Sequence, residues 1–272
     1  MQLAFIGAGQ MGMPMVQRLL ADHRDLTVFA RRQEVRDDCE AAGARVAADV
    51  ATAVSGADAV VLCLYSDPQV LELALGDDGL LAMMDEGSLL VSHTTGSPMT
   101  VRELANRGAP RGIRVVDAPV SGSADDIAAG HVTVMLGGEP DDVEQARAIV
   151  ASYGDPILAL GPLGSAQTVK LLNNALFAAN VQLTGEIERI TAGLGIELAQ
   201  VAAAIQSSSG ASYAMGVVAQ IGSATALAEA GGHFLAKDVA VVKEVAAELG
   251  VDLGLLTHVA EHGPLTYAAR NT

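Results

Sequence analysis

The chain of 272 residues contains no tryptophan and only four phenylalanines and four tyrosines. Half of its residues are nonetheless apolar, so alanine, valine, leucine and isoleucine must form most of the core. A chain of this length can bury a substantial core, either as one large domain or as two smaller ones.

Positive charge is scarce as well. The chain has 16 lysines and arginines but 32 aspartates and glutamates, which gives a formal net charge of -16. Nucleic acids and anionic membranes attract basic surfaces, so we expect neither as a partner. No apolar run approaches the roughly 20 residues that span a membrane. The two cysteines, Cys39 and Cys63, are too few for a disulfide framework. Without a secretory leader, the sequence predicts a soluble, cytoplasmic protein, and no metal site is predicted.

A glycine-rich motif opens the chain. An apolar run over residues 2–6, typical of a buried strand, is followed by G-A-G-Q-M-G and then by a helical pattern through Leu20. In this strand-to-helix context, G-x-G-x-x-G permits a tight turn and close approach of a pyrophosphate to the helix N-terminus. The motif predicts a dinucleotide site whose contacts include Gly7, Gly9, Gln10, Met11 and Gly12.

The end of the second predicted strand, residues 26–29, bears on the choice of dinucleotide. An NAD-selective site usually places an acid there for the ribose hydroxyls, but this chain continues with Ala30, Arg31 and Arg32. Guanidinium groups suit bidentate contact with a phosphate. We therefore predict NADP in preference to NAD; the alternative is that the arginines lie on a solvated loop.

Short strands then alternate with helices, which favours an α/β fold with a mainly parallel, doubly wound sheet. Leu64, at the end of one of these strands, is a further predicted cofactor contact. We expect strands over residues 44–47, 59–64, 88–92, 113–117, 132–136 and 157–160, and helices over residues 67–74, 99–107 and 140–152.

Ligands of such sheets bind at the carboxyl ends of the strands, where two loops stand out. The first is S-H-T-T-G-S-P over residues 92–98, in which Ser97 and Pro98 predict a helix start. Thr94 and Thr95 are not needed for that cap, and we expect them beside a nicotinamide ring. His93 could act as a base, although a lone histidine in such a loop is more often structural.

The second loop, D-A-P-V-S-G-S over residues 117–123, is punctuated by Pro119 and Gly122. Its backbone N–H groups and the Ser121 hydroxyl can converge on a carboxylate. The alternative is a polar surface turn.

From Ser165 the pattern becomes helical, and the first helix is expected to run to about Ala192. At about 1.5 Å per residue it would be roughly 40 Å long, enough to link two domains, 1–162 and 163–272. Further helices are expected over residues 197–206, 212–220, 237–249 and 253–261. Their small, weakly charged residues suit close helix contacts, including contacts between subunits.

Two polar side chains, Lys170 and Asn174, lie on one face of that long helix. Lys170 is one of only three lysines in a chain with thirteen arginines, which favours a role for a titratable ammonium. A solvated cation in a first helical turn would oppose the helix dipole. We therefore interpret Lys170 as a candidate acid/base.

Together these motifs resemble those of the β-hydroxyacid dehydrogenase family, which includes 3-hydroxyisobutyrate dehydrogenase and the glyoxylate/succinic semialdehyde reductases. The resemblance spans the chain through G-A-G-Q-M-G, T-T-G-S-P, D-A-P-V-S-G-S and G-P-L-G-S-A-Q-T-V-K-L-L-N-N, with a weaker match at F-L-A-K-D over residues 234–238. It implies a Rossmann-type domain, a long interdomain helix and an all-helical C-terminal domain that forms homodimers or higher homo-oligomers.

The resemblance also assigns roles. Lys170 matches the catalytic lysine and Asn174 the asparagine that binds substrate, while Thr95 and Lys237 match cofactor contacts. The loop positions implied to hold the substrate carboxylate are Ser121, Gly122 and Ser123, and Phe234 and Asp238 match residues that line the pocket. Three positions depart from the family pattern, namely Ser92, Gly96 and Ser123, which puts the substrate's identity in doubt.

The resulting hypothesis is an NADP-dependent oxidoreductase that moves a hydride to or from a small β-hydroxyacid or semialdehyde, with Lys170 as general acid/base. Burial can bring the pKa of such a lysine toward neutrality. One alternative is an imine reductase, although those enzymes usually lack the lysine. The other is a non-catalytic NADP-binding protein.

Overall fold

The computed structural model describes residues 1–76 and 78–267, without the side chains of His233 and Phe234. The predicted pocket side chain of Phe234 therefore lies outside the described residues. The chain forms two compact units, Met1–Lys170 and Leu171–Thr272. Because the division falls inside a single helix, α9 (Ser165–Leu194), the domain limits 1–162 and 163–272 remain a proposal.

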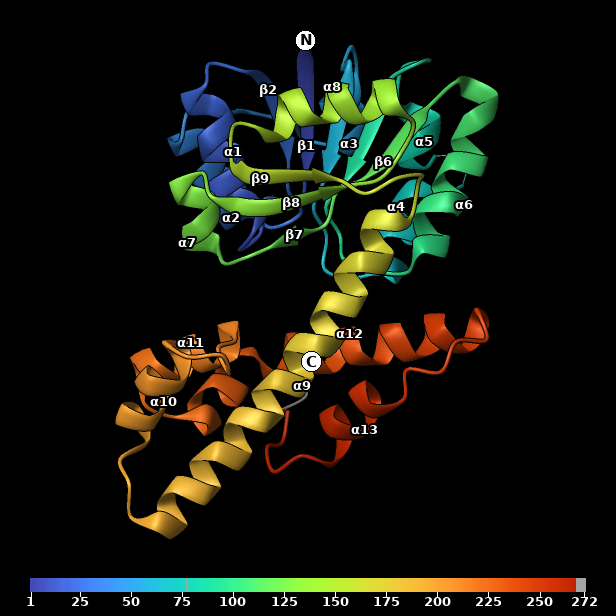
Figure 1. Cartoon of the computed structure of the whole chain (residues 1–272). Helices are drawn as coiled ribbons and strands as arrows, with labels where there is room; N and C mark the ends of the chain where they lie inside the picture. The colour runs from blue at the N-terminus through green and yellow to red at the C-terminus, as the bar shows by residue number, and fades with distance from the viewer. Residues whose placement is uncertain (77, 268–272) are drawn as a thin grey trace. The chain divides into compact units, whose positions relative to one another are not determined.

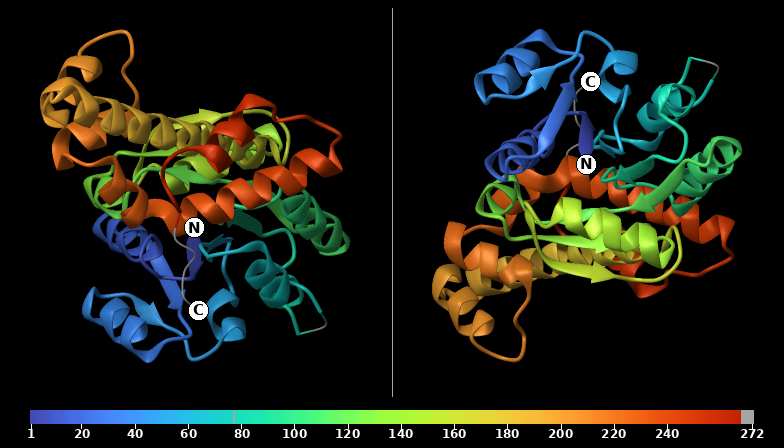
Figure 2. Two further views of the ribbon diagram at one scale, coloured as in Figure 1. Left: turned by 90° about the horizontal axis from the view of Figure 1, so that it is seen from below. Right: turned by 90° about the horizontal axis from the view of Figure 1, so that it is seen from above.

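The first unit is built on a six-stranded parallel sheet in the order β3-β2-β1-β4-β5-β6 (Figures 1 and 2). The strand order reverses between β1 and β4, which is the switch point where such sheets bind ligands. This confirms the predicted doubly wound sheet. The strands are β1 (Gln2–Ile6), β2 (Asp25–Phe29), β3 (Arg45–Val46), β4 (Ala59–Leu62), β5 (Leu89–Ser92) and β6 (Arg114–Asp117).

The central strands β1, β4 and β5 are buried on both faces, which explains why they are almost entirely apolar. Along β1, Leu3 and Phe5 enter one core while Ala4 and Ile6 enter the other. The first core is covered by α1 (Gly12–Ala21), α2 (Gln33–Ala41) and α8 (Pro140–Val150). The second is covered by α3 (Val50–Val54), α4 (Asp67–Ala74), α5 (Leu80–Met83) and α6 (Pro98–Gly108).

The last strands of this unit form a separate three-stranded sheet, which the alternating pattern did not reveal. It comprises β7 (Val120–Ser121), β8 (Val132–Leu136) and β9 (Gly154–Ala159), with β7 antiparallel to β8. Alternate residues of β8 enter the first core, the one that contains Leu3 and Phe5 of β1. The small sheet therefore packs over one face of the large one. Between β7 and β8, α7 (Ala124–Ala129) starts at a capping box formed by Ser123 and Asp126.

The second unit is all-helical and comprises most of α9 with α10 (Leu198–Gln206), α11 (Tyr213–Ile221), α12 (Ala224–Glu248) and α13 (Leu255–His262). Helix α12 begins well before residue 237, where the sequence predicted its start. Ser223 caps it, and Glu188 of α9 accepts hydrogen bonds from the Ala224 and Thr225 N–H groups. In the described ranges no helix is long and apolar enough to cross a membrane.

Candidate active site

The glycines of the first loop serve two different purposes. Gly7 has a φ of 99°, and a Cβ on it would overlap the carbonyl oxygen of Cys63. A Cβ on Gly12 would likewise overlap the carbonyl oxygen of Gly7. A Cβ on Gly9, by contrast, would meet no atom within 4 Å. Gly7 and Gly12 thus let the backbone pack closely, whereas Gly9 leaves open space in front of the loop.

The N-terminus of α1 faces the same loop and is not capped by a side chain. Its first turn carries no acidic residue, and the Met13 N–H bonds the Gly9 carbonyl at 2.8 Å. No carboxylate in that first turn therefore offsets the positive end of the helix dipole. Of the other predicted contacts, Gln10 is exposed and Met11 is half-buried. This arrangement fits the pyrophosphate of a dinucleotide.

The two arginines after β2 are both exposed but differ in their contacts. Arg32 donates to Glu34 Oε1 at 2.5 Å. Arg36, on α2, donates to the Ala30 carbonyl at 3.2 Å and so braces the same turn. In the described part of the chain, no hydrogen bond or ion pair engages Arg31. Of the two arginines, Arg31 therefore remains the candidate for contact with a phosphate.

The loop after β5 is fixed largely by its own polar groups. Thr94 is buried, and its Oγ1 accepts the Leu64 N–H at 2.9 Å, so Thr94 has a structural role. Ser97 caps α6 through the Met99 N–H at 3.1 Å, with Pro98 at the first position, as predicted. Thr95 remains half-buried between them.

Gly96, one of the departures from the family pattern, has a steric explanation. A Cβ at this position would overlap the carboxylate of Asp67. That carboxylate accepts the Ser97 N–H at 2.7 Å, so it closes the turn from the neighbouring helix α4. The space of a side chain at position 96 is thus taken by Asp67.

His93 is a buried structural residue in a neutral form. Its Nδ1 lies 2.5 Å from the Ala118 carbonyl, which can only accept, so Nδ1 carries the proton. Its Nε2 then accepts from the Tyr153 hydroxyl at 2.8 Å. Burial lowers the pKa of His93 to about 4. The structure thus favours the structural interpretation over a catalytic base.

The residues predicted to hold a carboxylate lie at the start of the small sheet. Ser121 belongs to β7 and pairs with Thr133 of β8. Gly122 has a φ of 145°, which favours glycine. The Ser123 hydroxyl donates to Asp126 Oδ2 at 2.8 Å and accepts the Asp126 N–H at 3.2 Å. These capping contacts explain the serine at position 123. A role of Ser123 in binding a substrate stays a prediction.

Lys170 and Asn174 are both buried polar residues on α9, 8% and 7% exposed. Asn174 Nδ2 donates to Asp238 Oδ2 at 2.5 Å. Lys237 Nζ forms an ion pair with Asp238 Oδ1 at a distance of 3.1 Å. Within the described residues, that oxygen accepts no hydrogen bond. The second unit thus brings together three predicted site residues from α9 and α12.

The predicted residues fall into two groups, one in each unit. The first unit holds the glycine loop, Arg31, Leu64, Thr95, the Ser121 loop and Lys170, and the second holds Asn174, Lys237 and Asp238. Sequence reasoning missed two buried residues of the first unit, Asp117 and Gln167, although both stand inside its own motifs. Gln167 could have been found from its spacing, because it precedes Lys170 by one helical turn and so lies on the same face of the helix.

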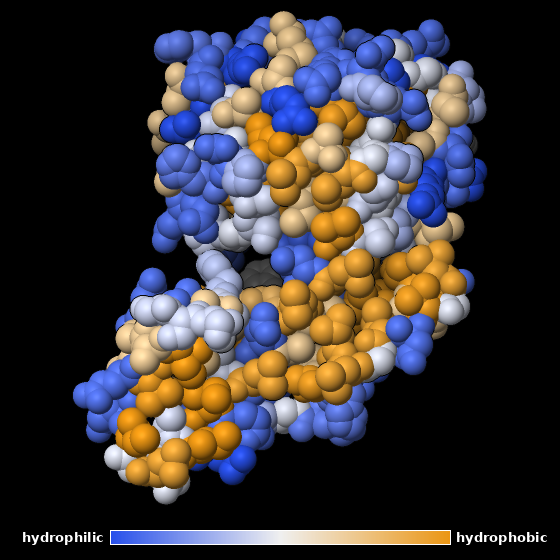
Figure 3. Space-filling model, in the orientation of Figure 1, coloured by the Kyte–Doolittle hydropathy of each residue, from blue (hydrophilic) through white to orange (hydrophobic). Residues whose placement is uncertain are grey.

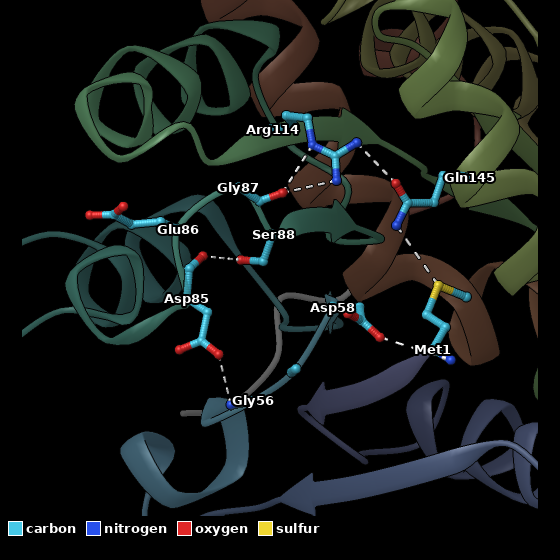
Figure 4. A pocket seen from close by; sticks show the side chains of 10 residues that line it. Met1, Gly56, Asp58, Asp85, Glu86, Gly87, Ser88, Arg114 and Gln145 are labelled. Carbon is cyan, nitrogen blue, oxygen red and sulfur yellow. Dashed lines mark hydrogen bonds and ion pairs between the residues drawn. The ribbon is translucent and has the colours of Figure 1, made fainter.

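Figure 4 shows a cavity at the opposite end of the strands, lined mainly by residues at or just before the strand starts, among them Met1, Asp58, Asp85 and Arg114. Several of its polar groups are engaged within the protein. The N-terminal amine lies 3.9 Å from Asp58, Asp85 accepts the Gly56 N–H, and Arg114 bonds the Gly87 carbonyl and Gln145. In the described ranges no group of three His, Cys, Asp or Glu side chains could hold a metal ion. The glycine-loop end of the sheet remains the candidate site.

Two family models match consecutive parts of the chain. The NAD binding domain of 6-phosphogluconate dehydrogenase matches residues 2–161, and the NAD-binding model of NADP-dependent 3-hydroxyisobutyrate dehydrogenase matches residues 164–269. The chain is 38% identical to the NAD-dependent L-serine dehydrogenase of Pseudomonas aeruginosa over 216 residues, which are 79% of this chain and 72% of that protein.

Solved structures share the fold. The Mycobacterium tuberculosis 3-hydroxyisobutyrate dehydrogenase with L-serine superposes with a TM-score of 0.86 at 24% identity, over 96% of this chain and 91% of that one. The imine reductase of Streptomyces aurantiacus gives a TM-score of 0.69 at 20% identity, over 96% and 92%. The first family model covers more than half of the chain, and the L-serine dehydrogenase is matched over most of its length. The chain belongs to the β-hydroxyacid dehydrogenase family and is an NAD(P)-dependent oxidoreductase that acts on CH–OH groups.

Proposed function

We propose that the protein transfers a hydride between NADP(H) and a small β-hydroxyacid or semialdehyde, with Lys170 as general acid/base. The observation that carries this proposal is the burial of Lys170 and Asn174 one turn apart on α9, with Asn174 held by Asp238. An ammonium and a carboxamide kept from water suit proton transfer and substrate orientation. The resemblance of the G-P-L-G-S-A-Q-T-V-K-L-L-N-N segment to the family motif supports the same roles.

When bound, the nicotinamide cofactor accepts or supplies the hydride. During oxidation the substrate C–H bond breaks as hydride leaves, and the hydroxyl proton passes to the neutral amine of Lys170. During reduction the Lys170 ammonium returns that proton to the carbonyl oxygen as hydride arrives at carbon. Asn174 orients the substrate oxygen, and the Ser121–Gly122 backbone with the Ser121 hydroxyl holds the substrate carboxylate.

Several residues would hold the cofactor. The glycine loop with Gln10, Met11 and the α1 N-terminus suits the pyrophosphate, and Leu64, Thr95 and Lys237 are the further proposed contacts. The preference for NADP is supported by the absence of an acid after β2 and by Arg31, which no described side chain neutralises. Arg31 is proposed to contact the 2′-phosphate of the adenosine ribose.

We further propose a homodimer or higher homo-oligomer formed through the second unit. Helix α9 leaves Leu176, Leu183 and Ile190 exposed at intervals of seven residues, and their exposures are 51%, 51% and 44%. Figure 3 shows apolar residues gathered over this unit. A heptad-spaced stripe on a long helix matches the same stripe on a second copy. Free Cys39 and Cys63 support a location in the reducing cytoplasm.

The experiment that tests the function is a cofactor-consumption screen followed by substitution of the lysine. Purified protein is assayed with NADP(H) and NAD(H) against L-serine, 3-hydroxyisobutyrate, small semialdehydes and a cyclic imine. On the best substrate, Lys170→Ala is expected to lower kcat on the order of 10²–10⁴-fold. Lys170→Arg should not rescue it, because a guanidinium does not release its proton near neutral pH.

Lys243→Ala is the matched control, since Lys243 lies on α12 and pairs with Glu261 at the surface. Near-wild-type turnover in Lys170→Ala would refute the assigned role. Faster turnover of the imine than of every hydroxyacid and semialdehyde would favour an imine reductase instead, a class that shares the fold.

A further inference from the structure

The first turn of α9 is capped by a carboxylate from a distant strand. Asp117, the last residue of β6, is fully buried, and its Oδ1 accepts the Gly164 N–H at 2.8 Å. Its Oδ2 accepts the Gln167 N–H, also at 2.8 Å. Gly164 stands at the usual N-cap position but has no side chain, so Asp117 supplies the missing acceptor. The start of the helix that carries Lys170 is thereby fastened to the sheet.

The side chain of Gln167 fastens that same turn to the loop after β5. It is 1% exposed, its Oε1 accepts the Gly96 N–H at 3.1 Å, and its Nε2 donates to the Thr94 carbonyl at 2.7 Å. The carboxamide thus pairs with the backbone on both sides of Thr95, as a neighbouring strand would. Both of its polar atoms are satisfied inside the protein.

We call the two side-chain hydrogen bonds of Gln167 the clamp. Further contacts connect this clamp to the central strands of the sheet. Thr94 Oγ1 accepts the Leu64 N–H, and the Leu64 side chain lies beside Gly7 in the glycine loop. A continuous set of hydrogen bonds therefore joins the end of β4, the Thr94–Gly96 backbone and the first turn of α9. All of these residues belong to the first unit. Proposed cofactor contacts and the turn that precedes Lys170 are joined through one side chain.

We propose that Gln167 is a positioning residue, which holds Thr95 against the cofactor in register with Lys170. The roles of Thr95 and Lys170 rest on the proposed function, whereas the clamp itself rests on the hydrogen bonds of Gln167. Gln167 touches neither the reacting atoms nor the cofactor in this assignment. It acts through the backbone of Thr94 and Gly96. Replacing it loosens cofactor binding and turnover together, more than it lowers the stability of the fold.

The chain offers a matched control in Gln182, a second buried glutamine of α9. Gln182 is also 1% exposed, and it clamps the backbone of Leu265 through both its N–H and its carbonyl at 2.8 Å. Gln182→Ala removes an equivalent pair of hydrogen bonds inside the second unit, together with a longer one from Nε2 to the Ala260 carbonyl at 3.4 Å. It therefore reports the cost of losing such a clamp without touching the Thr95 loop.

The test compares Gln167→Ala, Gln167→Glu and Gln182→Ala by three measurements: hydrogen exchange at the Gly96 amide, the dissociation constant of NADPH, and kcat. In Gln167→Ala we expect faster Gly96 exchange and an NADPH dissociation constant raised about tenfold, as loss of two hydrogen bonds predicts. In Gln182→Ala we expect both to stay at wild-type values. Gln167→Glu should regain NADPH affinity as the pH falls, because a protonated carboxyl again donates to Thr94.

The outcomes separate this proposal from the proposed function. If Lys170→Ala stays active while Gln167→Ala still weakens NADPH binding, the lysine's role fails and the clamp stands. Unchanged Gly96 exchange and unchanged NADPH affinity in Gln167→Ala would overturn the clamp. So would equal losses of affinity in Gln182→Ala, or a Gln167→Glu variant whose affinity does not recover at lower pH. Should Gln167→Ala fail to fold, Gln167→Glu carries the test alone.

Discussion

Asn174 Nδ2 donates a 2.5 Å hydrogen bond to Asp238 Oδ2, and both side chains are 7% exposed. Asn174→Asp would set two buried carboxylates against each other. A lost buried partner of this kind costs about 1–3 kcal/mol, more for charged groups. Protonation of one carboxyl would remove the repulsion and restore a hydrogen-bond donor, so the lost stability should return as the pH falls. Urea unfolding of the variant across pH measures this.

Asn106→Asp is the control for that substitution, because Asn106 is exposed on α6 of the first unit and is not part of the Asn174–Asp238 pair. It should change the free energy of unfolding only slightly at any pH. Equal destabilisation in the two variants would show that the contact with Asp238 is not what matters.

The glycine loop allows folding and binding to be tested separately. Gly7→Ala should destabilise the protein, because its Cβ would overlap the Cys63 carbonyl at a φ of 99°. Gly9→Ala should leave the melting temperature near that of the wild type, since its Cβ would meet no atom within 4 Å. It should nevertheless weaken cofactor binding, which calorimetric titration with NADPH measures. A Gly9→Ala variant that binds NADPH normally would place the pyrophosphate elsewhere.

Cofactor choice should depend on Arg31 more than on Arg32, which already pairs with Glu34. Arg31→Ala is expected to raise the KM for NADP by about tenfold, the equivalent of one charge-assisted hydrogen bond, and to leave the KM for NAD unchanged. Arg32→Ala serves as the control and should have a smaller effect. Comparable efficiency with both cofactors in the wild type would contradict the proposed preference.

His93 should make stability depend on pH. Its pKa is lowered from 6.5 in the unfolded chain to about 4 in the fold. The folded state therefore binds fewer protons in this window, so the contribution is present above pH 6.5 and is lost as the pH falls through about 4. The loss amounts to about 3 kcal/mol. Denaturant unfolding of wild type and His93→Gln, which does not titrate, should show this difference in slope; parallel curves would rule it out.

The proposed oligomer makes a prediction about α9. Leu183→Asp should dissociate the assembly to smaller species, because a carboxylate would enter the apolar stripe. Leu255→Asp is the control, as Leu255 is 73% exposed on a different helix, α13. Light scattering after gel filtration gives the masses. A monomeric wild-type protein, or equal dissociation in both variants, would refute an interface along α9.

The parts of the fold set by local sequence patterns were predictable. The apolar strands of the large sheet, the helix over residues 67–74 and the Ser97–Pro98 cap agree with the sequence prediction, because each depends on neighbouring residues. The small sheet was not separated from the large one, since a buried strand has the same composition in either sheet. Helix α7 was missed although Ser123 and Asp126 form a recognisable capping box.

What could not be predicted depends on partners far along the chain. The start of α12 at Ala224 is secured in part by Glu188, and the start of α9 by Asp117, contacts that no local pattern encodes. The hydrogen bonds of Gln167 and Gln182 could not be predicted either, because a glutamine in a helix is ordinarily exposed. The candidate site was predictable where motifs named single residues, and unpredictable where a side chain acts through a distant backbone.

The close fit of Asp67 against Gly96 constrains how this site can change in descent. A side chain at position 96 has no room while the Asp67 carboxylate occupies that space, and loss of that carboxylate deprives the Ser97 N–H of its acceptor. A side chain at position 96 therefore requires the Asp67 carboxylate to move, and a change at position 67 makes room for it. Family members that differ from this chain at position 96 should differ at position 67 as well, so that the two positions vary together.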